Sequence, residues 1–556
     1  MTNDAIANQF SLLSKLMDIH GENSFKSKSH ANAAFNIEKL NQNISDLDEQ
    51  KIKQLPGIGV SVTQKILEIL SKGEMSQLKE LIIATPPGIL EMMRMKGLGA
   101  KKINIIWREM EIDNLGELLH ACKENRLKFF KGFGEKTQTK IIELIEFYQS
   151  NLGNQLYASV ESLSEECLAF LQNIFPTNHV SIVGEIKKQS QIISSIDYII
   201  EEKCDVIKQK LLAEITLEFV EENDEFLSYK MSNELLIKLH PISAKNKLEK
   251  IFHLTASEIF KTKLLSQYPL QNFREEADYF AGHHLQVIPA YLWENENVIK
   301  RAEDKTIPTA MQTSDIKGLI HCHSKWSDGN NTIAEMAAAS KALGHEYMLI
   351  TDHSKAAFYA QGLSVQRINE QHREIEQLNA KLENFVIYKG IECDILNDGS
   401  LDYDDDVLAT FDCIVASIHA NLNMTEDKAM KRLIAAITNP YTSILGHMTG
   451  RLLLSRTGYP VNHEEIIDCC AAHDVVIELN ANPKRLDMDW SKIEYALSKQ
   501  VMISINPDAH SIQGISDMRY GVLQAQKAML TNEQNLSSFD RNEFESFMHD
   551  QHYKRN

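Results

Sequence analysis

The sequence predicts a multidomain α/β protein with an all-helical N-terminal region, an α+β middle region and a C-terminal parallel barrel. The chain has 556 residues, which is enough for several domains. A glycine-rich turn opens a helix at three places within residues 1–150. After residue 316, short apolar strands alternate with helices, a pattern that favours a parallel barrel.

Composition and charge exclude several classes of protein. No apolar run is long enough to cross a bilayer, and Met1 to Phe10 lacks the apolar core of a signal peptide. The eight cysteines show no CxxC spacing, so we expect a reduced, cytoplasmic protein without disulfides or a structural zinc finger. The net charge of −19 argues against a protein that coats nucleic acid with its whole surface, and leaves room for a local binding track.

Three repeats of the pattern apolar-x-Gly-apolar-Gly each precede a helix in residues 1–150. Paired glycines let the backbone turn tightly and approach a ligand, and the following helix offers free N–H groups to a phosphate. The repeats resemble the helix-hairpin-helix motif, which holds the DNA backbone without reading sequence. The alternative is that each turn only joins two helices. The glycines concerned are Gly57, Gly59, Gly97, Gly99, Gly132 and Gly134.

Two amphipathic helices are expected within Asn8 to Leu40. This segment resembles the small N-terminal domain of bacterial family X DNA polymerases. In that family a basic stretch follows a Phe-Lys pair, whereas here only Lys26 and Lys28 carry firm positive charge. We divide this part into a helical domain at 1–80 and a fingers-like helical domain at 81–150.

Residues 151–250 resemble the palm of nucleotidyltransferases, and residues 251–300 the thumb that follows it. In that superfamily a Gly-Ser turn holds a triphosphate, and three aspartates on two strands bind two Mg²⁺ ions. Three strands are expected in this order, at 179–184, 192–201 and 235–240.

The palm departs from this pattern at each position. The turn reads Gly184-Glu185, and Ser195 and Asp197 stand where the family has two aspartates. The third acid falls near Leu236, with Glu234 two places away. One residual acid, Asp197, cannot hold two Mg²⁺ ions, so we expect that nucleotidyl transfer has been lost.

After a polar linker at 301–315, the domain at 316–556 places histidines and carboxylates at the ends of apolar strands. Side chains alternate along a strand, so His321 and His323 project together while Cys322 points away. The C-terminal strand ends of parallel barrels carry the active sites, and unpaired imidazoles are costly to bury. The pattern therefore predicts a metal site. Its candidate ligands are His321, His323, Asp328, His353, Glu392, His419, His447, Asp508 and His510.

The order of these residues resembles the polymerase-and-histidinol-phosphatase (PHP) domain, which implies a distorted (βα)7 barrel and three divalent metal ions. The resemblance assigns the catalytic set His321, His323, Glu392 and Asp508 to one metal. It assigns Asp328, His353 and His510 to a second, with Glu392 bridging, and His419 and His447 to the third. Mixed imidazole and carboxylate ligands suit Mn²⁺, Zn²⁺ or Fe²⁺ better than Mg²⁺, and such metals activate water for attack on a phosphate.

Five residues near other strand ends are candidates for contact with a substrate phosphate. An ordinary structural role is the alternative for each, and three further histidines, His345, His463 and His473, are expected to face solvent. The phosphate candidates are Arg451, Arg456, Asn480, Asn482 and Arg485.

The whole chain resembles a bacterial family X DNA polymerase with a C-terminal PHP domain, a family that couples gap filling to 3′–5′ exonuclease activity in DNA repair. We expect a monomeric, DNA-binding, metal-dependent phosphodiesterase that processes gapped, nicked or 3′-ended DNA. Three alternatives stay open. They are an active polymerase with relocated acids such as Glu185 or Glu234, a DNA-binding scaffold with an idle metal site, and a small-molecule phosphatase.

Overall fold

The computed structural model describes residues 1–556 except 41, 96, 125, 177–178, 212–217, 231–234, 271–272 and 556. The chain forms two compact units, Met1–Leu152 and Gly153–Asn556. No helix in the described part of the chain is long and apolar enough to span a membrane.

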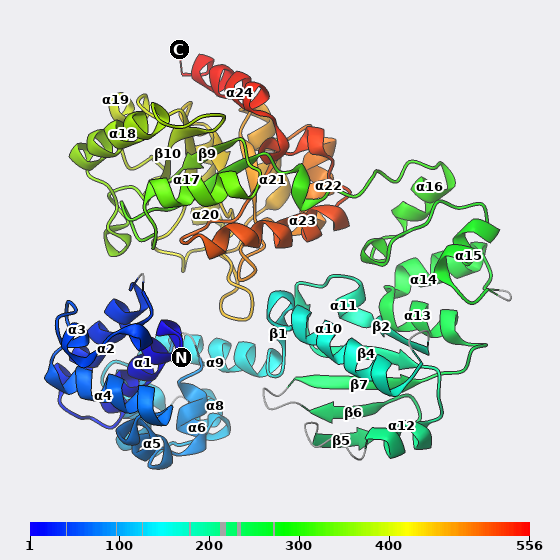
Figure 1. The fold of residues 1–556 in the computed structure, drawn as a ribbon, viewed down its shortest axis with the longest axis horizontal. Coiled ribbons are helices and arrows are strands. Elements are labelled where there is room, and N and C mark those ends of the chain that lie inside the picture. Colours follow the sequence, from blue (N-terminus) through cyan, green and yellow to red (C-terminus); the bar gives the residue numbers. More distant parts are fainter. Residues whose placement is uncertain are drawn as a thin grey trace. The chain divides into compact units, whose positions relative to one another are not determined.

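The first unit is helical (Figure 1). It contains two apolar cores. In α1, Ile6, Phe10, Leu13 and Met17 recur at helical spacing and are fully buried, and the Thr2 side chain caps the helix start. The helices are α1 (Asn3–Ile19), α2 (Ser24–Glu38), η1 (Ile44–Asp46), α3 (Glu49–Lys53), α4 (Val60–Lys72), α5 (Ser76–Ile83), α6 (Pro87–Met92), α7 (Ala100–Arg108), α8 (Leu115–Lys123), η2 (Leu127–Phe129) and α9 (Glu135–Ser150).

The second unit begins with a five-stranded sheet of order β2-β4-β7-β6-β5, in which only β4 and β7 run parallel. Their register sets Ser195 opposite Leu236 and Asp197 opposite Lys238. The elements are β1 (Gln155–Leu156), α10 (Tyr157–Ile174), β2 (Val180–Val183), α11 (Gly184–Lys187), β3 (Ile192–Ile193), β4 (Ser195–Ile200), α12 (Cys204–Leu211), β5 (Glu218–Glu222), β6 (Leu227–Lys230) and β7 (Leu236–Pro241).

A small helical part follows and packs around aromatic rings, with those of Phe252 and Trp293 4.7 Å apart between centroids. Its elements are α13 (Lys247–Thr255), α14 (Glu258–Gln267), α15 (Glu276–Gly282), η4 (Ala290–Leu292) and α16 (Asn297–Glu303). The first residues of the predicted linker, 301–303, belong to α16, and Ala302 on this helix is buried in the same core.

Seven parallel strands form the C-terminal barrel in the order β14-β13-β12-β11-β10-β9-β8. A bridge between Cys322 and Ala509 brings the first and last strands together, so the barrel is nearly closed. The predicted parallel barrel is confirmed. The strands are β8 (Gly318–Cys322), β9 (Tyr347–Ile350), β10 (Val386–Asp394), β11 (Cys413–Ser417), β12 (Ile444–Leu445), β13 (Val476–Asn480) and β14 (Ile503–Asn506).

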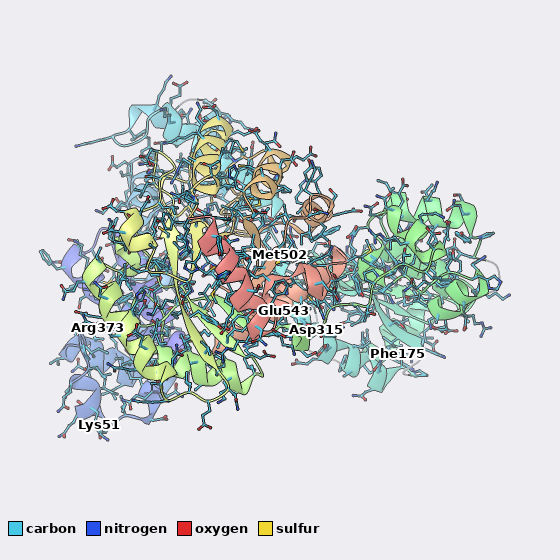
Figure 2. The ribbon with its side chains drawn as sticks, turned by 90° about the horizontal axis from the view of Figure 1, so that it is seen from above. Lys51, Phe175, Asp315, Arg373, Met502 and Glu543 are labelled. Carbon is cyan, nitrogen blue, oxygen red and sulfur yellow. The ribbon has the colours of Figure 1, made fainter. Side chains whose placement is uncertain are left out.

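Helices surround the barrel, and α17 (Ile333–Ala342) begins with a capping box between Thr332 and Glu335. On α18, Arg373 is exposed while Gln371 and His372 are buried, so this helix has one solvated face (Figure 2). The helices are η5 (Thr313–Asp315), α17 (Ile333–Ala342), η6 (Phe358–Ala360), α18 (Val365–Asn379), α19 (Asp405–Leu408), α20 (Glu426–Ile437), α21 (His463–Ala472), α22 (Trp490–Ser498), η7 (Gln513–Asp517), α23 (Met518–Lys527), η8 (Asn532–Gln534), η9 (Leu536–Ser538) and α24 (Arg541–Tyr553).

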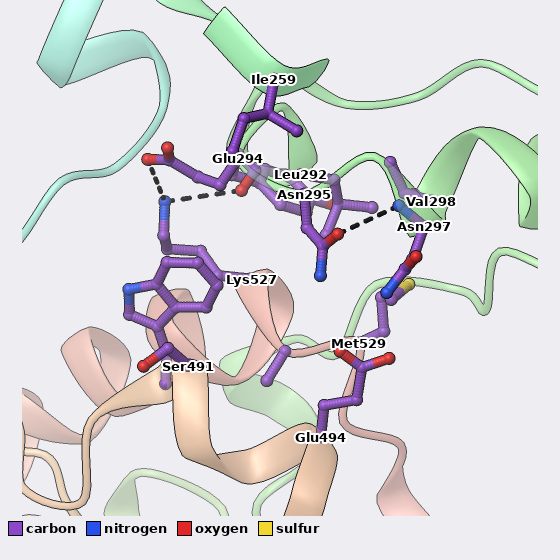
Figure 3. A pocket seen from close by; sticks show the side chains of 13 residues that line it. Ile259, Leu292, Glu294, Asn295, Asn297, Val298, Ser491, Glu494, Lys527 and Met529 are labelled. Carbon is purple, nitrogen blue, oxygen red and sulfur yellow. Dashed lines mark hydrogen bonds and ion pairs between the residues drawn. The ribbon is translucent and has the colours of Figure 1, made fainter. Parts of the chain in front are cut away.

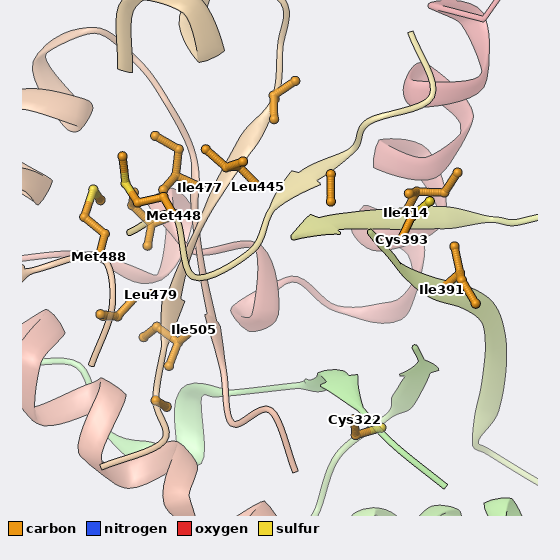
Figure 4. Packing of buried hydrophobic residues seen from close by; sticks show 14 of the residues in the cluster. Cys322, Ile391, Cys393, Ile414, Leu445, Met448, Ile477, Leu479, Met488 and Ile505 are labelled. Carbon is orange, nitrogen blue, oxygen red and sulfur yellow. The ribbon is translucent and has the colours of Figure 1, made fainter. Parts of the chain in front are cut away.

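The barrel core is made of apolar side chains from successive strands. They include Cys322, Ile391, Leu445 and Ile505 (Figure 4). At the N-terminal end of the strands, Tyr347 stacks on Phe544 of α24 with ring centroids 4.4 Å apart. Because α24 closes that end, the polar residues at the opposite strand ends are the ones available to a substrate.

A buried lysine joins the barrel to the parts that precede it in the second unit. The Lys527 ammonium, at the end of α23, donates to the carbonyl of Lys188 at 2.7 Å. It lies 3.6 Å from Glu294 Oε1 (Figure 3). It also lies 4.8 Å from the ring centroid of Trp490. Burial lowers the pKa of Lys527 to about 8.

Candidate functional site

The predicted pair of histidines lies on a bulge at the end of β8. The register shifts between Ile320 and Cys322, and His321 has a φ of +61°. A bulge of this kind redirects a side chain beside a site. The rings of His321 and His323 lie 5.4 Å apart between centroids, while Cys322 is buried in the apolar core.

Five histidine nitrogens surround the carboxylate of Glu392, which is 1% exposed. Glu392 Oε1 lies 3.0 Å from Nε2 of His419, 3.0 Å from Nε2 of His447 and 3.4 Å from Nε2 of His321. Its Oε2 lies 2.9 Å from Nδ1 of His353 and 3.7 Å from Nε2 of His323. Glu392 is therefore the geometric centre of the cluster.

The two aspartates lie beside the same histidines. Asp508 Oδ1 is 3.1 Å from Nε2 of His323 and 3.6 Å from Nε2 of His321. Asp328 Oδ1 is 3.4 Å from Nε2 of His510 and 3.6 Å from Nε2 of His353. All nine predicted ligands are thus brought into one cluster at the C-terminal ends of the strands.

The donor atoms fit divalent metal ions. Nε2 of His321 and Oε2 of Glu392 are buried and lie close to other polar atoms, but neither makes a correctly oriented hydrogen bond among the described residues, which is unfavourable for a buried polar atom without a cation. Three groups have ligand atoms within 4.8 Å of one another. They are His323, Asp328, His353 and His510; His321, His323 and Asp508; and His353, Glu392 and His419.

The pKa values of two histidines in the cluster also favour a cation at this place. Burial opposes the charged form of His419, but Glu392 and Asp394 raise its pKa to about 10. His510 follows the same pattern, with Asp328 and Asp508 raising its pKa to about 9. The carboxylates of the cluster therefore favour positive charge at these two histidines, and a metal cation would supply positive charge at the same place.

Two buried carboxylates behind the ligands were not singled out from the sequence. Glu478 Oε2 lies 2.5 Å from Nδ1 of His321, and its Oε1 accepts from the backbone N–H of His447 at 3.2 Å. Asp394 Oδ1 lies 3.1 Å from Nδ1 of His419. Such partners fix the orientation of a metal-binding imidazole. Both residues could have been found from the sequence, because each is an acid inside an apolar strand and lies two residues from another polar residue.

Asp352, which is fully buried, holds the turn that follows His323. Its carboxylate accepts from the backbone N–H and the hydroxyl of Ser324, and from those of Ser327. Gln371 of α18 donates to it at 2.7 Å. These bonds position the segment between His323 and Asp328.

The phosphate candidates divide into two kinds. The guanidinium of Arg451 donates to the carbonyls of Arg485 and Leu486 and to Asp489, so its contacts are structural. Asn480 is fully buried and donates to Glu478 and Asp508.

The Asn482 side chain accepts from the backbone N–H of Lys484 in a turn. Arg485 Nε lies 3.4 Å from Asp508 Oδ2, at the edge of the cluster. Arg456 donates to the carbonyl of Gly450. Arg485 therefore stays a candidate for a phosphate contact, whereas Arg456 makes a backbone contact of the same kind as those of Arg451.

His345 is 9% exposed and its Nδ1 lies 2.9 Å from the hydroxyl of Ser340. The expectation that it faces solvent is wrong, because the turn after α17 folds it back against the helix. His473 is exposed and His463 is half-buried.

The three glycine hairpins have a common geometry. Gly57, Gly97 and Gly132 have φ values of +73°, +107° and +90°, which favour glycine. The second glycines, Gly59, Gly99 and Gly134, are the N-caps of α4, α7 and α9. A Cβ added at any of the second glycines would meet none of the described atoms within 4 Å. The space beside the N-terminus of each of these helices is therefore open among the described residues.

The basic residues predicted near the N-terminus, Lys26 and Lys28, are exposed on α2, whereas His30 is 6% exposed.

In the sheet of the second unit, Asp197 is held by protein groups. Its Oδ1 lies 2.7 Å from Nε2 of His240, and its Oδ2 accepts from the Ser195 hydroxyl at 2.6 Å. The neighbouring strand presents Leu236 and Lys238.

Glu185 and Glu234 are the two acids that an active polymerase would use in place of the missing aspartates. The Glu185 carboxylate accepts from the backbone N–H and hydroxyl of Ser194. Glu234 lies outside the described residues.

Two domain models match separate parts of the chain, and one known protein is similar to it over nearly its whole length. A helix-hairpin-helix domain model matches residues 1–75 and a PHP domain model matches residues 320–482. The chain is 31% identical over 554 residues to a Bacillus subtilis protein named DNA polymerase/3′-5′ exonuclease PolX, covering 96% of each chain.

Shorter similarities link the chain to proteins named as probable phosphatases. One from Caldanaerobacter subterraneus is 28% identical over 155 residues, covering 25% of this chain and 58% of the relative. One from Vibrio parahaemolyticus is 27% identical over 225 residues, covering 38% of this chain and 84% of the relative.

Proposed function

The chain belongs to the PolX-type family X DNA polymerases, with a helix-hairpin-helix N-terminus and a PHP domain, and from this premise we propose that it is a metal-dependent phosphodiesterase that trims DNA 3′ ends. The observation that supports hydrolysis most strongly is the cluster of five histidines around Glu392. Its ligand types favour Mn²⁺, Zn²⁺ or Fe²⁺.

The roles of the protein's own groups follow from their positions. His321, His323, Glu392 and Asp508 would hold one ion, and Glu392 also faces the histidines of the other two groups. Divalent ions at these ligands would lower the pKa of water and neutralise charge on the phosphate. Arg485, whose Nε is 3.4 Å from Asp508 Oδ2, would donate to a phosphate oxygen and orient the scissile bond.

We further propose that the palm has lost nucleotidyl transfer. Both oxygens of Asp197 already have partners in His240 and Ser195. The Leu236 side chain occupies the strand position facing Ser195, where a further acid would be needed. Two Mg²⁺ ions need several carboxylates on this sheet face, and the described residues here supply one.

The alternative with the most support is a working polymerase, because the Bacillus subtilis relative's name includes that activity. Primer extension on gapped DNA with Mg²⁺ or Mn²⁺ separates the two, using a His321→Ala/His323→Ala background so that the primer is not degraded. We expect no extension. Synthesis that Asp197→Ala abolishes would establish the polymerase instead.

Two other functions are distinguished by substrate. We expect cleavage of a single-stranded oligonucleotide with a higher kcat/KM than hydrolysis of p-nitrophenyl phosphate. The reverse order would favour a small-molecule phosphatase, the activity that the names of several relatives suggest. DNA binding without hydrolysis under Mn²⁺, Zn²⁺ or Fe²⁺ would favour a scaffold.

The proposed substrates are gapped, nicked or 3′-ended DNA. We propose that the protein acts on them as a monomer in the cytoplasm. The helix-hairpin-helix turns would hold the DNA backbone through the free N–H groups at the starts of α4, α7 and α9.

A further inference from the structure

The loop after β9 exposes two adjacent aromatic side chains. Phe358 is 85% exposed and Tyr359 is 61% exposed, and their ring centroids lie 6.0 Å apart. The flanking residues Ala357 and Ala360 are each 1% exposed. The loop thus buries its small residues and presents its large apolar rings to solvent, although burying such rings would stabilise the fold.

The loop is firmly held, so the exposed rings have a fixed position. The backbone N–H of Leu363 donates to the carbonyl of His353 at 2.8 Å, which closes the loop at its base. Arg367 donates to the carbonyl of Gln361 at 2.5 Å and also to the carbonyl of Trp326. The second bond ties the loop to the segment that carries Asp328.

The loop that carries Tyr359 begins at a residue of the cluster, because His353 is a candidate ligand and its carbonyl accepts the hydrogen bond that closes the loop. Partial burial, followed by the negative charges of Asp394, Glu392 and Asp328, raises the pKa of Tyr359 above its ordinary range. Arg485 acts on the same phenol in the opposite direction. The rings therefore stand at the rim of the cluster.

Positive charge lies at the edge of the cluster. Nε of Arg485 is 3.4 Å from Asp508 Oδ2. Guanidinium groups bind phosphates, and exposed aromatic rings bind nucleobases by stacking. A small phosphate ester would use the first feature and leave the second without a partner.

We propose that Phe358 and Tyr359 form a stacking subsite for an unpaired base of the DNA strand whose 3′ end lies at the metal-ligand cluster. The inference rests on the proposed function and adds to it a preference for single-stranded ends that carry bases. Because the stacking is independent of base identity, the subsite accepts any of the four bases.

A fluorescent base reports the stacking without catalysis. The full-length protein in EDTA is mixed with a single-stranded oligonucleotide carrying 2-aminopurine as its 3′-terminal base, and a dye at the 5′ end reports total binding by anisotropy. We expect the wild type to quench the 2-aminopurine. Phe358→Ala/Tyr359→Ala loses this quenching while the anisotropy still shows a complex through the other DNA contacts, and Phe358→Trp restores it in a Tyr359 wild-type background.

Catalysis supplies the second readout. With Mn²⁺, the wild type is expected to cleave a normal 3′ end with a kcat/KM about 5- to 100-fold above that for an end of abasic nucleotides. The Phe358→Ala/Tyr359→Ala variant loses this preference. Tyr553→Ala, which removes a 70% exposed ring from α24, serves as the matched control and keeps both quenching and preference.

Equal quenching in the wild type and the double variant, or an unchanged preference in the variant, would overturn the subsite. So would self-association that depends on Phe358, seen by sedimentation, without quenching. If the wild type cleaves no DNA with any metal, the proposed function fails, whereas the quenching in EDTA still decides the base contact.

Discussion

The Oε2 atom of Glu478 lies 2.5 Å from Nδ1 of His321, and both residues are fully buried. This contact fixes Nδ1 as the side of the ring that faces the protein. Nε2 is thereby left for the cluster, where it faces Glu392 and Asp508. Asn506 also donates to Glu478 Oε2, at 2.9 Å, so the carboxylate is itself held in place.

The Glu478→Gln substitution is expected to weaken metal binding about 10- to 100-fold while the barrel stays folded, because an amide orients the imidazole less strongly than a carboxylate. Calorimetric titration of the metal-free protein with Mn²⁺ or Zn²⁺ measures the change. Glu376→Gln, an exposed residue paired with Lys389, is the control and should bind as the wild type does. Unchanged affinity in Glu478→Gln would show that the contact does not orient His321.

The second glycines of the hairpins give a prediction about DNA binding. Replacing Gly59, Gly99 and Gly134 by Ala is expected to weaken binding by about 1 kcal/mol for each lost backbone contact, because the methyl group fills the space beside the helix N-terminus. Fluorescence anisotropy measures the affinity. The Tm should change little, since the added Cβ meets none of the described atoms.

Gly57→Ala provides the contrast. Gly57 has a φ of +73°, and a Cβ there would lie 2.1 Å from Nδ2 of Asn36. This variant should therefore lower the Tm of the first unit. Intact DNA affinity in the triple variant would mean that these turns only connect helices.

The buried Lys527 predicts a pH dependence of stability. Its pKa of about 8 in the folded chain lies below the value of about 10.4 expected when unfolded. Between these values the unfolded state binds more protons, so the free energy of unfolding should rise with pH by at most about 3 kcal/mol. Denaturant unfolding at pH 8 and pH 10 measures the change.

The Lys527→Met variant is the reference for this measurement. As the pH rises from about 8 to about 10, the free energy of unfolding of the wild type should increase relative to that of the variant. A difference that is independent of pH would contradict the assignment to Lys527.

Much of the cluster of histidines and carboxylates was predictable because parallel strands bring their C-terminal ends together. Nine residues separated by up to 189 positions, from His321 to His510, could therefore be grouped from their place at strand ends alone. The bulge at His321 was not predictable, since it depends on the pairing of β8 with β9.

Contacts between residues that are distant in sequence could not be predicted. The sequence leaves both a phosphate contact and a structural role open for Arg451, and the structure shows that its guanidinium reaches Gln191, 260 residues away. The sequence does not identify Glu478 as a partner of His321, because its strand is apolar in composition and only the barrel brings the two residues together. The polar composition at 301–303 does not reveal a helix, because the burial of Ala302 depends on tertiary packing.

The most direct test of the account is degradation of a 5′-labelled single-stranded oligonucleotide by full-length protein loaded with Mn²⁺, Zn²⁺ or Fe²⁺. The account predicts that the wild type and Asp197→Ala shorten the strand from its 3′ end at equal rates, whereas His321→Ala/His323→Ala leaves it intact. Digestion by His321→Ala/His323→Ala at the wild-type rate would contradict the claim that the histidine and carboxylate cluster carries out hydrolysis.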